Sequence, residues 1–140
     1  MKRCLIACLG LLPGPVALAD SVAGIDRLLC ATGRIVLCFE DGECYPVLAG
    51  EADVPPFVVI DLEERLMSTT RASSENRTTA INSVVREDGV LYLQGVELGR
   101  AFSFLIDEAS GRVTVAVSRD GFSVTVFGAC TDADVEVGAP

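Results

Sequence analysis

Three consecutive segments decide the fold of this chain: RAFSFLID (100–107), RVTVAVS (112–118) and FSVTVFGAC (122–130). In each of them apolar side chains alternate with small or polar ones, as Val113, Val115 and Val117 do in the second segment. A period of two, rich in β-branched and aromatic residues, is typical of a strand with one buried face. Turn signals separate the segments, so they predict consecutive antiparallel strands.

The same pattern continues toward the N-terminus. Six further runs are predicted as strands: RIVLCFE (34–40), ECYPVL (43–48), FVVIDL (57–62), LMSTTR (66–71), TTAINSVV (78–85) and VLYLQGVEL (90–98). Asp-Gly pairs separate several of these runs and favour tight hairpin turns. The stretch 20–29 is too short for periodicity to decide between a strand and a helical turn. We therefore predict an all-β fold, a single antiparallel meander that closes into a small barrel, with a β-sandwich as the alternative.

Residues 1–19 have the three-part layout of a cleavable signal peptide. The start is basic, the run CLIACLGLL (4–12) is apolar, and Ala17-Leu18-Ala19 supplies the small residues that a signal peptidase reads. The apolar run is well short of the roughly 20 residues that a membrane-spanning helix needs. We predict cleavage between Ala19 and Asp20 and one exported domain at 20–140, in the periplasm of a bacterium or secreted from it.

Four cysteines follow the predicted leader, namely Cys30, Cys38, Cys44 and Cys130. In an exported chain they predict two disulfides, for which three connectivities exist. Cys38 and Cys44 flank Asp41-Gly42, and a three-residue hairpin loop there would place them within bonding range. This pairing leaves Cys30 with Cys130, a bridge that would close nearly the whole domain. A zinc site is disfavoured because the spacings are not paired CxxC and the chain has no histidine.

The charge and the missing residue types exclude several functions. The formal charge is −9, and it becomes −11 once Lys2 and Arg3 leave with the leader. A domain this acidic does not bind nucleic acid by neutralising phosphates, and anionic lipid does not attract it. Without histidine, and without lysine beyond Lys2, the Ser-His-Asp, Cys-His and Schiff-base mechanisms are excluded. No Gly-rich phosphate loop occurs, so no cofactor is predicted.

Carboxylates are the main catalytic groups that remain. They form two clusters, with Asp61, Glu63 and Glu64 after one predicted strand and Asp107 and Glu108 at the end of another. Paired carboxylates about 5 to 10 Å apart can cleave glycosides. However, the glutamates are expected to face water in turns, and the chain has no Trp and only two Tyr to stack a sugar. Asp61 lies in an apolar run, where alternation would allow it to face solvent. We expect it instead to pair with an arginine such as Arg100, because a buried charge is rarely left without a partner.

Three acidic runs are candidates for binding calcium, at 40–43, 87–89 and 132–136. None of them has the ligand spacing of an EF-hand loop, and their Asp-Gly pairs are explained as turns. The sequence therefore predicts no metal site.

The segment GRAFSFLIDEASGRVTVAVSRDGFSVTVFGAC (99–130) is similar to a pattern in small exported proteins of alphaproteobacteria without an assigned function. The resemblance extends more loosely to the region of Cys38 and Cys44 and to FVVIDL (57–62). It implies a signal peptide, few cysteines and the FGAC ending, and it supplies no catalytic residue. In architecture alone, the predicted domain also resembles the periplasmic inhibitors of C-type lysozyme, although a Ser-Gly-Xaa-Tyr type of inhibitory loop is not evident here.

Together these features predict a non-enzymatic periplasmic domain that binds a protein or a small ligand of the cell envelope. A rigid, disulfide-linked scaffold can present loops for binding, and the candidate contact loops are 50–56 and 71–77. Three alternatives stay open: a lysozyme-inhibitor-like protein, a structural envelope protein, and a carboxylate-dependent hydrolase.

Overall fold

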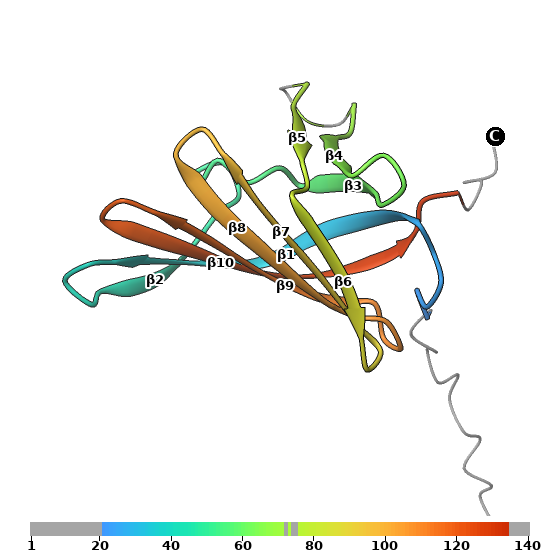
Figure 1. The fold of residues 1–140 in the computed structure, drawn as a ribbon. Helices are drawn as coiled ribbons and strands as arrows, with labels where there is room; N and C mark the ends of the chain where they lie inside the picture. Colours follow the sequence, from blue (N-terminus) through green and yellow to red (C-terminus); the bar gives the residue numbers. More distant parts are fainter. Residues whose placement is uncertain (1–20, 72, 74–75, 135–140) are drawn as a thin grey trace, which may run out of the picture.

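The computed structural model describes residues 21–71, 73 and 76–134, which form one curled antiparallel sheet (Figure 1). The predicted signal peptide and its cleavage site lie outside these residues. Within the described part of the chain there is no helix, and hence none long and apolar enough to cross a membrane. The ten strands are β1 (Arg27–Phe39), β2 (Cys44–Val47), β3 (Phe57–Asp61), β4 (Leu66–Thr69), β5 (Thr78–Ala80), β6 (Ser83–Glu87), β7 (Val90–Glu97), β8 (Arg100–Asp107), β9 (Arg112–Arg119) and β10 (Phe122–Asp132).

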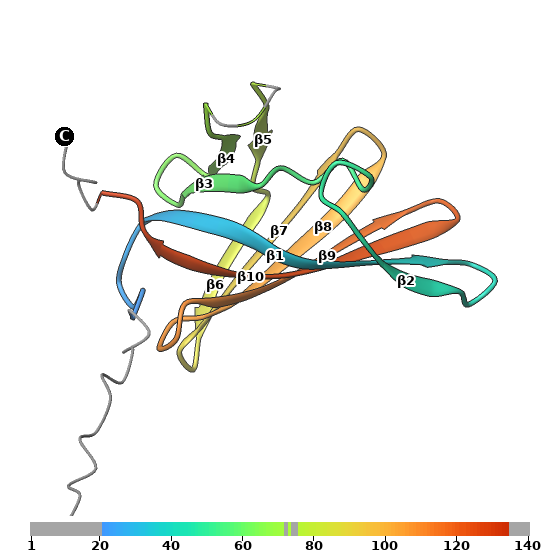
Figure 2. The ribbon, with the colours of Figure 1, turned by 180° about the vertical axis from the view of Figure 1, so that it is seen from behind.

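The strand order is β5-β4-β3-β1-β10-β9-β8-β7-β6, and β2 pairs with β1 outside this path. Strands β6 to β10 form the predicted meander, and β10 then pairs with β1, so that the first and last strands lie side by side. The sheet curls into a half-barrel, as the reverse view shows (Figure 2). This confirms the prediction of a barrel-like meander over the β-sandwich.

Two predicted strands differ from the observed ones by more than two residues or in number, and both errors have a physical cause. The first strand begins at Arg27 rather than Arg34, because the buried Leu28 already pairs with Ile60 of β3 and with Asp132 of β10. The predicted strand 78–85 is divided into β5 and β6. At the division Ile81 turns into the core and its amide donates to the carbonyl of Arg65, beside β4, whereas the amide of Asn82 donates to Gln94 of β7. These two residues thus connect the two edge strands of the sheet.

Tight hairpins fix where the strands start. At Asp88-Gly89 the φ angles are 51° and 76°, and at Leu98-Gly99 they are 47° and 74°. Two successive residues with positive φ characterise the type I′ turn, whose twist matches that of the flanking strands. Leucine is unusual in this conformation, and the tight turn that it forms places Arg100, the first residue of β8, directly opposite Glu97, the last residue of β7.

The two predicted disulfides are present, Cys30–Cys130 and Cys38–Cys44. Each joins two residues that face each other across neighbouring strands, with Cα atoms 3.9 Å and 4.1 Å apart. The first bridge links β1 to β10, and the second links β1 to β2. Two disulfides fit a protein that matures in an oxidising compartment.

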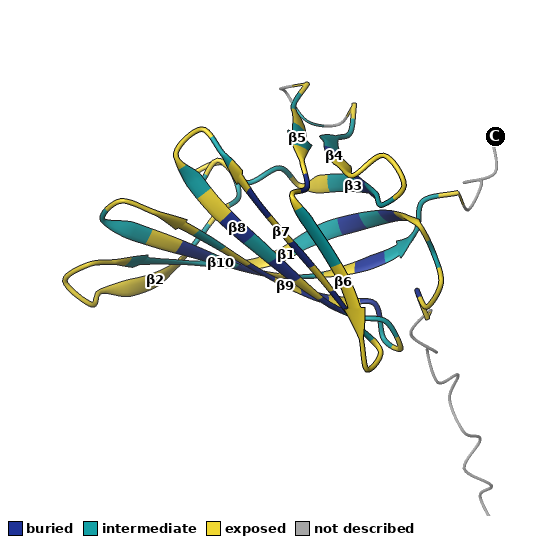
Figure 3. Ribbon diagram, viewed as in Figure 1, coloured by how far each residue is buried: buried dark blue, intermediate teal, exposed yellow. Residues whose placement is uncertain are grey.

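Burial differs between the two ends of the half-barrel (Figure 3). We call the end where β1 and β7 begin and β3 and β8 finish the filled end. It holds the largest side chains that are less than 2% exposed, namely Val22, Leu28, Ile60, Leu91, Leu93 and Ile106. We call the opposite end, where β8 and β10 begin, the open end. Here β9 and β10 contribute valines, and burial decreases along β9 from Val113 to the half-buried Val117.

Candidate functional site

A pocket of about 370 Å³ lies in the concave face of the half-barrel, toward the open end. Its wall is mainly apolar. The side chains that form it include Val115 and Val117 of β9, Val124 and Val126 of β10, Leu37 of β1, and Val58 of β3. Valine is smaller than the leucine and isoleucine of the filled end, so the same curvature of the sheet encloses space here instead of packed atoms. The volume falls in the range of small-molecule sites, about 300 to 1,000 Å³.

Two phenylalanines of β8 give the pocket a rigid aromatic side. The rings of Phe102 and Phe104 meet edge to face, with centroids 6.0 Å apart and an interplanar angle of 88°, and each residue is 9% exposed. Gly95 of β7 makes room for this arrangement, because a Cβ atom at this position would overlap the Phe102 ring and would lie 2.9 Å from the carbonyl oxygen of Ala80. Any larger residue at 95 would therefore push this wall of the pocket out of place.

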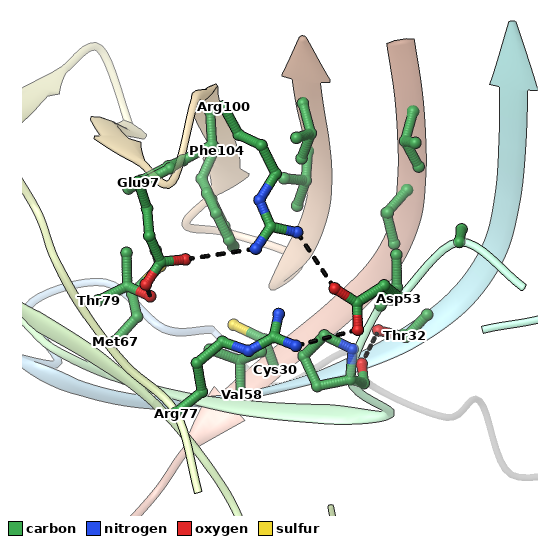
Figure 4. Close-up of a pocket in the computed structure, with 18 of the residues that line it drawn as sticks. Cys30, Thr32, Asp53, Val58, Met67, Arg77, Thr79, Glu97, Arg100 and Phe104 are labelled. Carbon is green, nitrogen blue, oxygen red and sulfur yellow. Dashed lines mark hydrogen bonds and ion pairs between the residues drawn. The ribbon is translucent and has the colours of Figure 1, made fainter. Parts of the chain in front are cut away.

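Charged and polar side chains gather at one part of the pocket mouth (Figure 4). Arg77 Nη2 lies 2.9 Å from Asp53 Oδ1, and Arg100 Nη1 lies 3.3 Å from Asp53 Oδ2. Arg100 Nη2 is also 3.8 Å from Glu97 Oε2, and the Thr79 hydroxyl donates a 2.6 Å hydrogen bond to Glu97 Oε1. Three ion pairs and this hydrogen bond connect the five side chains, Asp53, Arg77, Thr79, Glu97 and Arg100, which we call the mouth cluster.

The members of the mouth cluster come from separate parts of the chain. Glu97 and Arg100 face each other across the β7–β8 hairpin, Thr79 belongs to β5, and Arg77 immediately precedes β5. Asp53 comes from the loop 48–56. This loop is attached to β1 by Thr32, whose hydroxyl donates to the Pro55 carbonyl at 2.8 Å and whose amide donates to the Pro56 carbonyl at 2.9 Å.

Asp53 is the most exposed charged group of the cluster. Its side chain is 64% exposed, whereas those of Arg77 and Arg100 are 24% and 19% exposed. The hydrogen bond from Arg77 has the largest effect and lowers the pKa of Asp53. Burial opposes it as the second-largest effect, but the charge of Arg77 and the contact with Arg100 also lower the pKa, so that the net shift is downward. The Asp53 carboxylate therefore stays ionised at neutral pH. Its backbone φ is 53°, a left-handed conformation that aspartate tolerates better than most residues.

The two predicted contact loops meet at this mouth. The loop 50–56 supplies Asp53, and Arg77, at the end of the loop 71–77, pairs with it. The expected pairing of Asp61 with Arg100 is wrong. Arg100 contacts Asp53 and Glu97 instead, and Asp61 Oδ1 accepts a 2.9 Å hydrogen bond from the amide of Glu64 in the β3–β4 turn. Asp61 has this role because a carboxylate at the end of a strand can satisfy the amides of the turn that follows.

The carboxylates of the second predicted cluster, Asp107 and Glu108, are also engaged in contacts with neighbouring residues. Asp107 Oδ1 accepts hydrogen bonds from the amide of Ser110 at 2.9 Å and from its hydroxyl at 2.6 Å, and these bonds lower the pKa of Asp107. Glu108 was expected to face water, but its side chain is only 12% exposed and Oε1 lies 3.0 Å from Arg86 Nε. Glu63 and Glu64 are exposed, as expected. Neither Asp61 nor Asp107 belongs to the lining of the pocket in the concave face.

The acidic runs form turns where the structure describes them. Gly42 has φ 90° and donates to the Phe39 carbonyl at 3.0 Å, which closes the hairpin between β1 and β2. The third run is described as far as Asp134, which pairs with Arg27 at 3.1 Å. Among residues 21–71, 73 and 76–134, no group of three or more acidic or cysteine side chains is placed to hold a metal ion.

Sequence reasoning did not identify the pocket or the mouth cluster as a unit. One usable signal was present: valines alternate in 113–117 and 124–126, whereas the other end of the sheet carries leucine and isoleucine. The cluster itself depends on contacts between positions that are far apart in sequence, such as Asp53 and Arg100. Searches against protein-family models, curated proteins and solved structures found no match to this chain.

Proposed function

We propose that this chain is an exported binding domain that holds a small, mainly apolar ligand in the half-barrel pocket. The observation that carries the proposal is the pocket itself. It has a volume of about 370 Å³ and a mainly apolar wall that includes valine and phenylalanine side chains, and the mouth cluster lies at one part of its rim. Apolar walls with a few convergent polar groups are typical of small-molecule sites. Burying an apolar ligand there is worth about 25 cal/mol for each Å² removed from water.

The contacts that the carboxylates of the mouth cluster make with arginines favour a binding role over a catalytic one. The carboxylates of Asp53 and Glu97 both contact Arg100, and Glu97 also accepts the hydrogen bond of Thr79. A general acid needs a pKa near the working pH, whereas the arginines lower that of Asp53. These groups are therefore suited to orient or select a ligand, and poorly suited to transfer a proton to it.

Export is the second part of the proposal. Its support is the basic and apolar start of the chain with Ala17-Leu18-Ala19, together with two disulfides in the folded domain. We place the domain in the bacterial periplasm or outside the cell, where its ligand would be a molecule of the cell envelope or the medium.

A fluorescent apolar probe tests the binding function. N-phenylnaphthylamine is neutral and fluoresces strongly only in an apolar environment, and the chain has no tryptophan to interfere. We expect saturable fluorescence with the oxidised protein. Val117 is half-buried and lines the pocket at the open end. Val117→Phe should weaken probe binding by at least about tenfold, because the added ring occupies space that the probe needs.

Ser118→Phe is the matched control. Ser118 is the next residue of β9, is exposed and points to the opposite face of the sheet, so the same ring added there should leave probe binding unchanged. If the two variants bind the probe equally well, or if the protein gives no saturable signal, the pocket is not a binding site for apolar ligands. Circular dichroism of both variants verifies that each retains the fold.

A further inference from the structure

We propose that the ligand of this pocket is an amphiphile with an apolar chain and a single carboxylate head, and that Asp53 occupies the place of that head between Arg77 and Arg100. The inference rests on the proposed function, and it adds the chemical class of the ligand and the residue that the ligand displaces. The side chains of Asp53, Arg77 and Arg100 differ in how far they are buried.

The two arginine side chains are largely buried, whereas the side chain of Asp53 is at the surface. Arg77 and Arg100 are about three-quarters buried or more at the mouth of an apolar pocket, and they approach the same carboxylate from two directions (Figure 4). Arginines bind carboxylates well because their planar N–H groups match the two oxygens. The carboxylate that they share belongs to an exposed side chain on the loop 48–56. A rotation of this one side chain toward solvent would leave both guanidinium groups facing the mouth.

The loop can release Asp53 without losing its own structure. Its amides at Glu51 and Val54 donate to Leu48 and Ala49 of the same loop, and Thr32 holds the end of the loop through the carbonyls of Pro55 and Pro56. The contacts of Asp53 with the arginines are side-chain contacts and are separate from these bonds. Displacing the carboxylate therefore requires a change of rotamer and does not require the loop to unfold.

The charges at the mouth select a monoanion. The carboxylate of Asp53 places one negative charge between Arg77 and Arg100. When Asp53 turns outward, this negative charge moves away from the arginines at the mouth of an apolar cavity. A carboxylate head replaces the lost charge, and its chain enters the pocket. A cationic amphiphile offers no such replacement. The formal charge of −9 belongs to the whole chain and does not cancel this direct contact between opposite charges.

Binding of decanoate and of decanol, which differ in the charge of the head, tests this inference by calorimetry on the oxidised protein. We expect decanoate to bind more tightly than decanol. Asp53→Asn removes the competing charge, and asparagine keeps the left-handed backbone that this position requires. It should tighten decanoate binding by at least about fivefold and leave decanol unchanged. Arg100→Gln should weaken decanoate selectively.

Asp88→Asn is the matched control, since Asp88 is also an exposed aspartate with positive φ, located at the β6–β7 turn away from the mouth. It should change neither affinity. Equal binding of decanoate and decanol by the wild type and all variants would overturn the inference and leave the apolar pocket in place as a binding site. If neither compound binds although N-phenylnaphthylamine does, the inference fails as well. If all three fail to bind, the proposed function itself fails.

Discussion

The filled end and the open end of the half-barrel are built from the same strands, and they differ in the size of the inward side chains. Strand β7 carries Leu91 and Leu93 toward the filled end but Gly95 toward the open end, and β9 carries Val113, Val115 and Val117 in succession along its inner face. All these positions satisfy the same period-two pattern, which specifies the direction of a side chain. The comparison teaches that alternation decides the fold, whereas residue volume decides whether the curled sheet encloses a core or a pocket.

We expect the largest loss of stability on removal of the Cys30–Cys130 disulfide, which links the first strand to the last. Cys30 and Cys130 are 100 residues apart, and a loop of that length corresponds to about 4 to 5 kcal/mol in the chain-entropy account of disulfides. Replacing both by alanine should lower the free energy of unfolding by about that amount. Urea unfolding monitored by circular dichroism measures the loss.

The bridge at the tip of the open end provides the comparison. Cys38 and Cys44 are separated by 6 positions, so replacing both should cost less, about 2 kcal/mol by the same relation. An equal or larger cost for this pair would contradict the chain-entropy account, in which the bridge that closes the longer loop stabilises the domain more.

Truncation of inward side chains sharpens the comparison. Leu93 is fully buried at the filled end, so Leu93→Ala should cost about 2 to 5 kcal/mol through the lost contacts and the new cavity. Val117 already faces a pocket and is only half-buried, and Val117→Ala should cost less than about 1.5 kcal/mol. Urea unfolding of both variants, with the disulfides intact, measures the two costs. A cost at Val117 as large as that at Leu93 would mean that the open end is packed in solution.

The smallest expected effect concerns the contact of Asp53 with its arginines. The pKa of Asp53 in the folded protein lies below its ordinary value of 3.8, so its contribution to stability is present above that value and is lost as the pH falls through the lower folded pKa. Because the side chain is 64% exposed and screened by solvent, Asp53→Asn should cost less than about 1 kcal/mol at neutral pH.

The pH dependence of this contribution is measured as the free energy of unfolding of the wild type and of Asp53→Asn, at several pH values between neutral pH and about pH 2. The difference between the two proteins should shrink as the pH falls. Taking this difference removes the contribution of other carboxylates, such as Asp107, whose pKa is also lowered but which both proteins share. A difference that is constant over the whole range would show that Asp53 makes no favourable ionic contact in solution.

The sequence allowed the strands and both disulfides to be predicted, because alternation, Asp-Gly turns and the spacing of Cys38 and Cys44 are local signals. It did not allow the bend at Ile81-Asn82 to be predicted, since this bend depends on hydrogen bonds to Arg65 and Gln94. The mouth cluster was missed for the same reason. The partner of Arg100 is determined by the position of the loop 48–56 above the sheet and by no feature of the neighbouring sequence.

Methyl resonances of the protein, followed by NMR during titration with N-phenylnaphthylamine, test most directly whether the open end is a ligand pocket. We predict saturable shifts for the valines that line it, Val115, Val117, Val124 and Val126, and little change for Leu91, Leu93 and Ile106 at the filled end. Shifts confined to exposed methyl groups of the outer face, such as those of Leu105, or the absence of saturable shifts, would contradict this account.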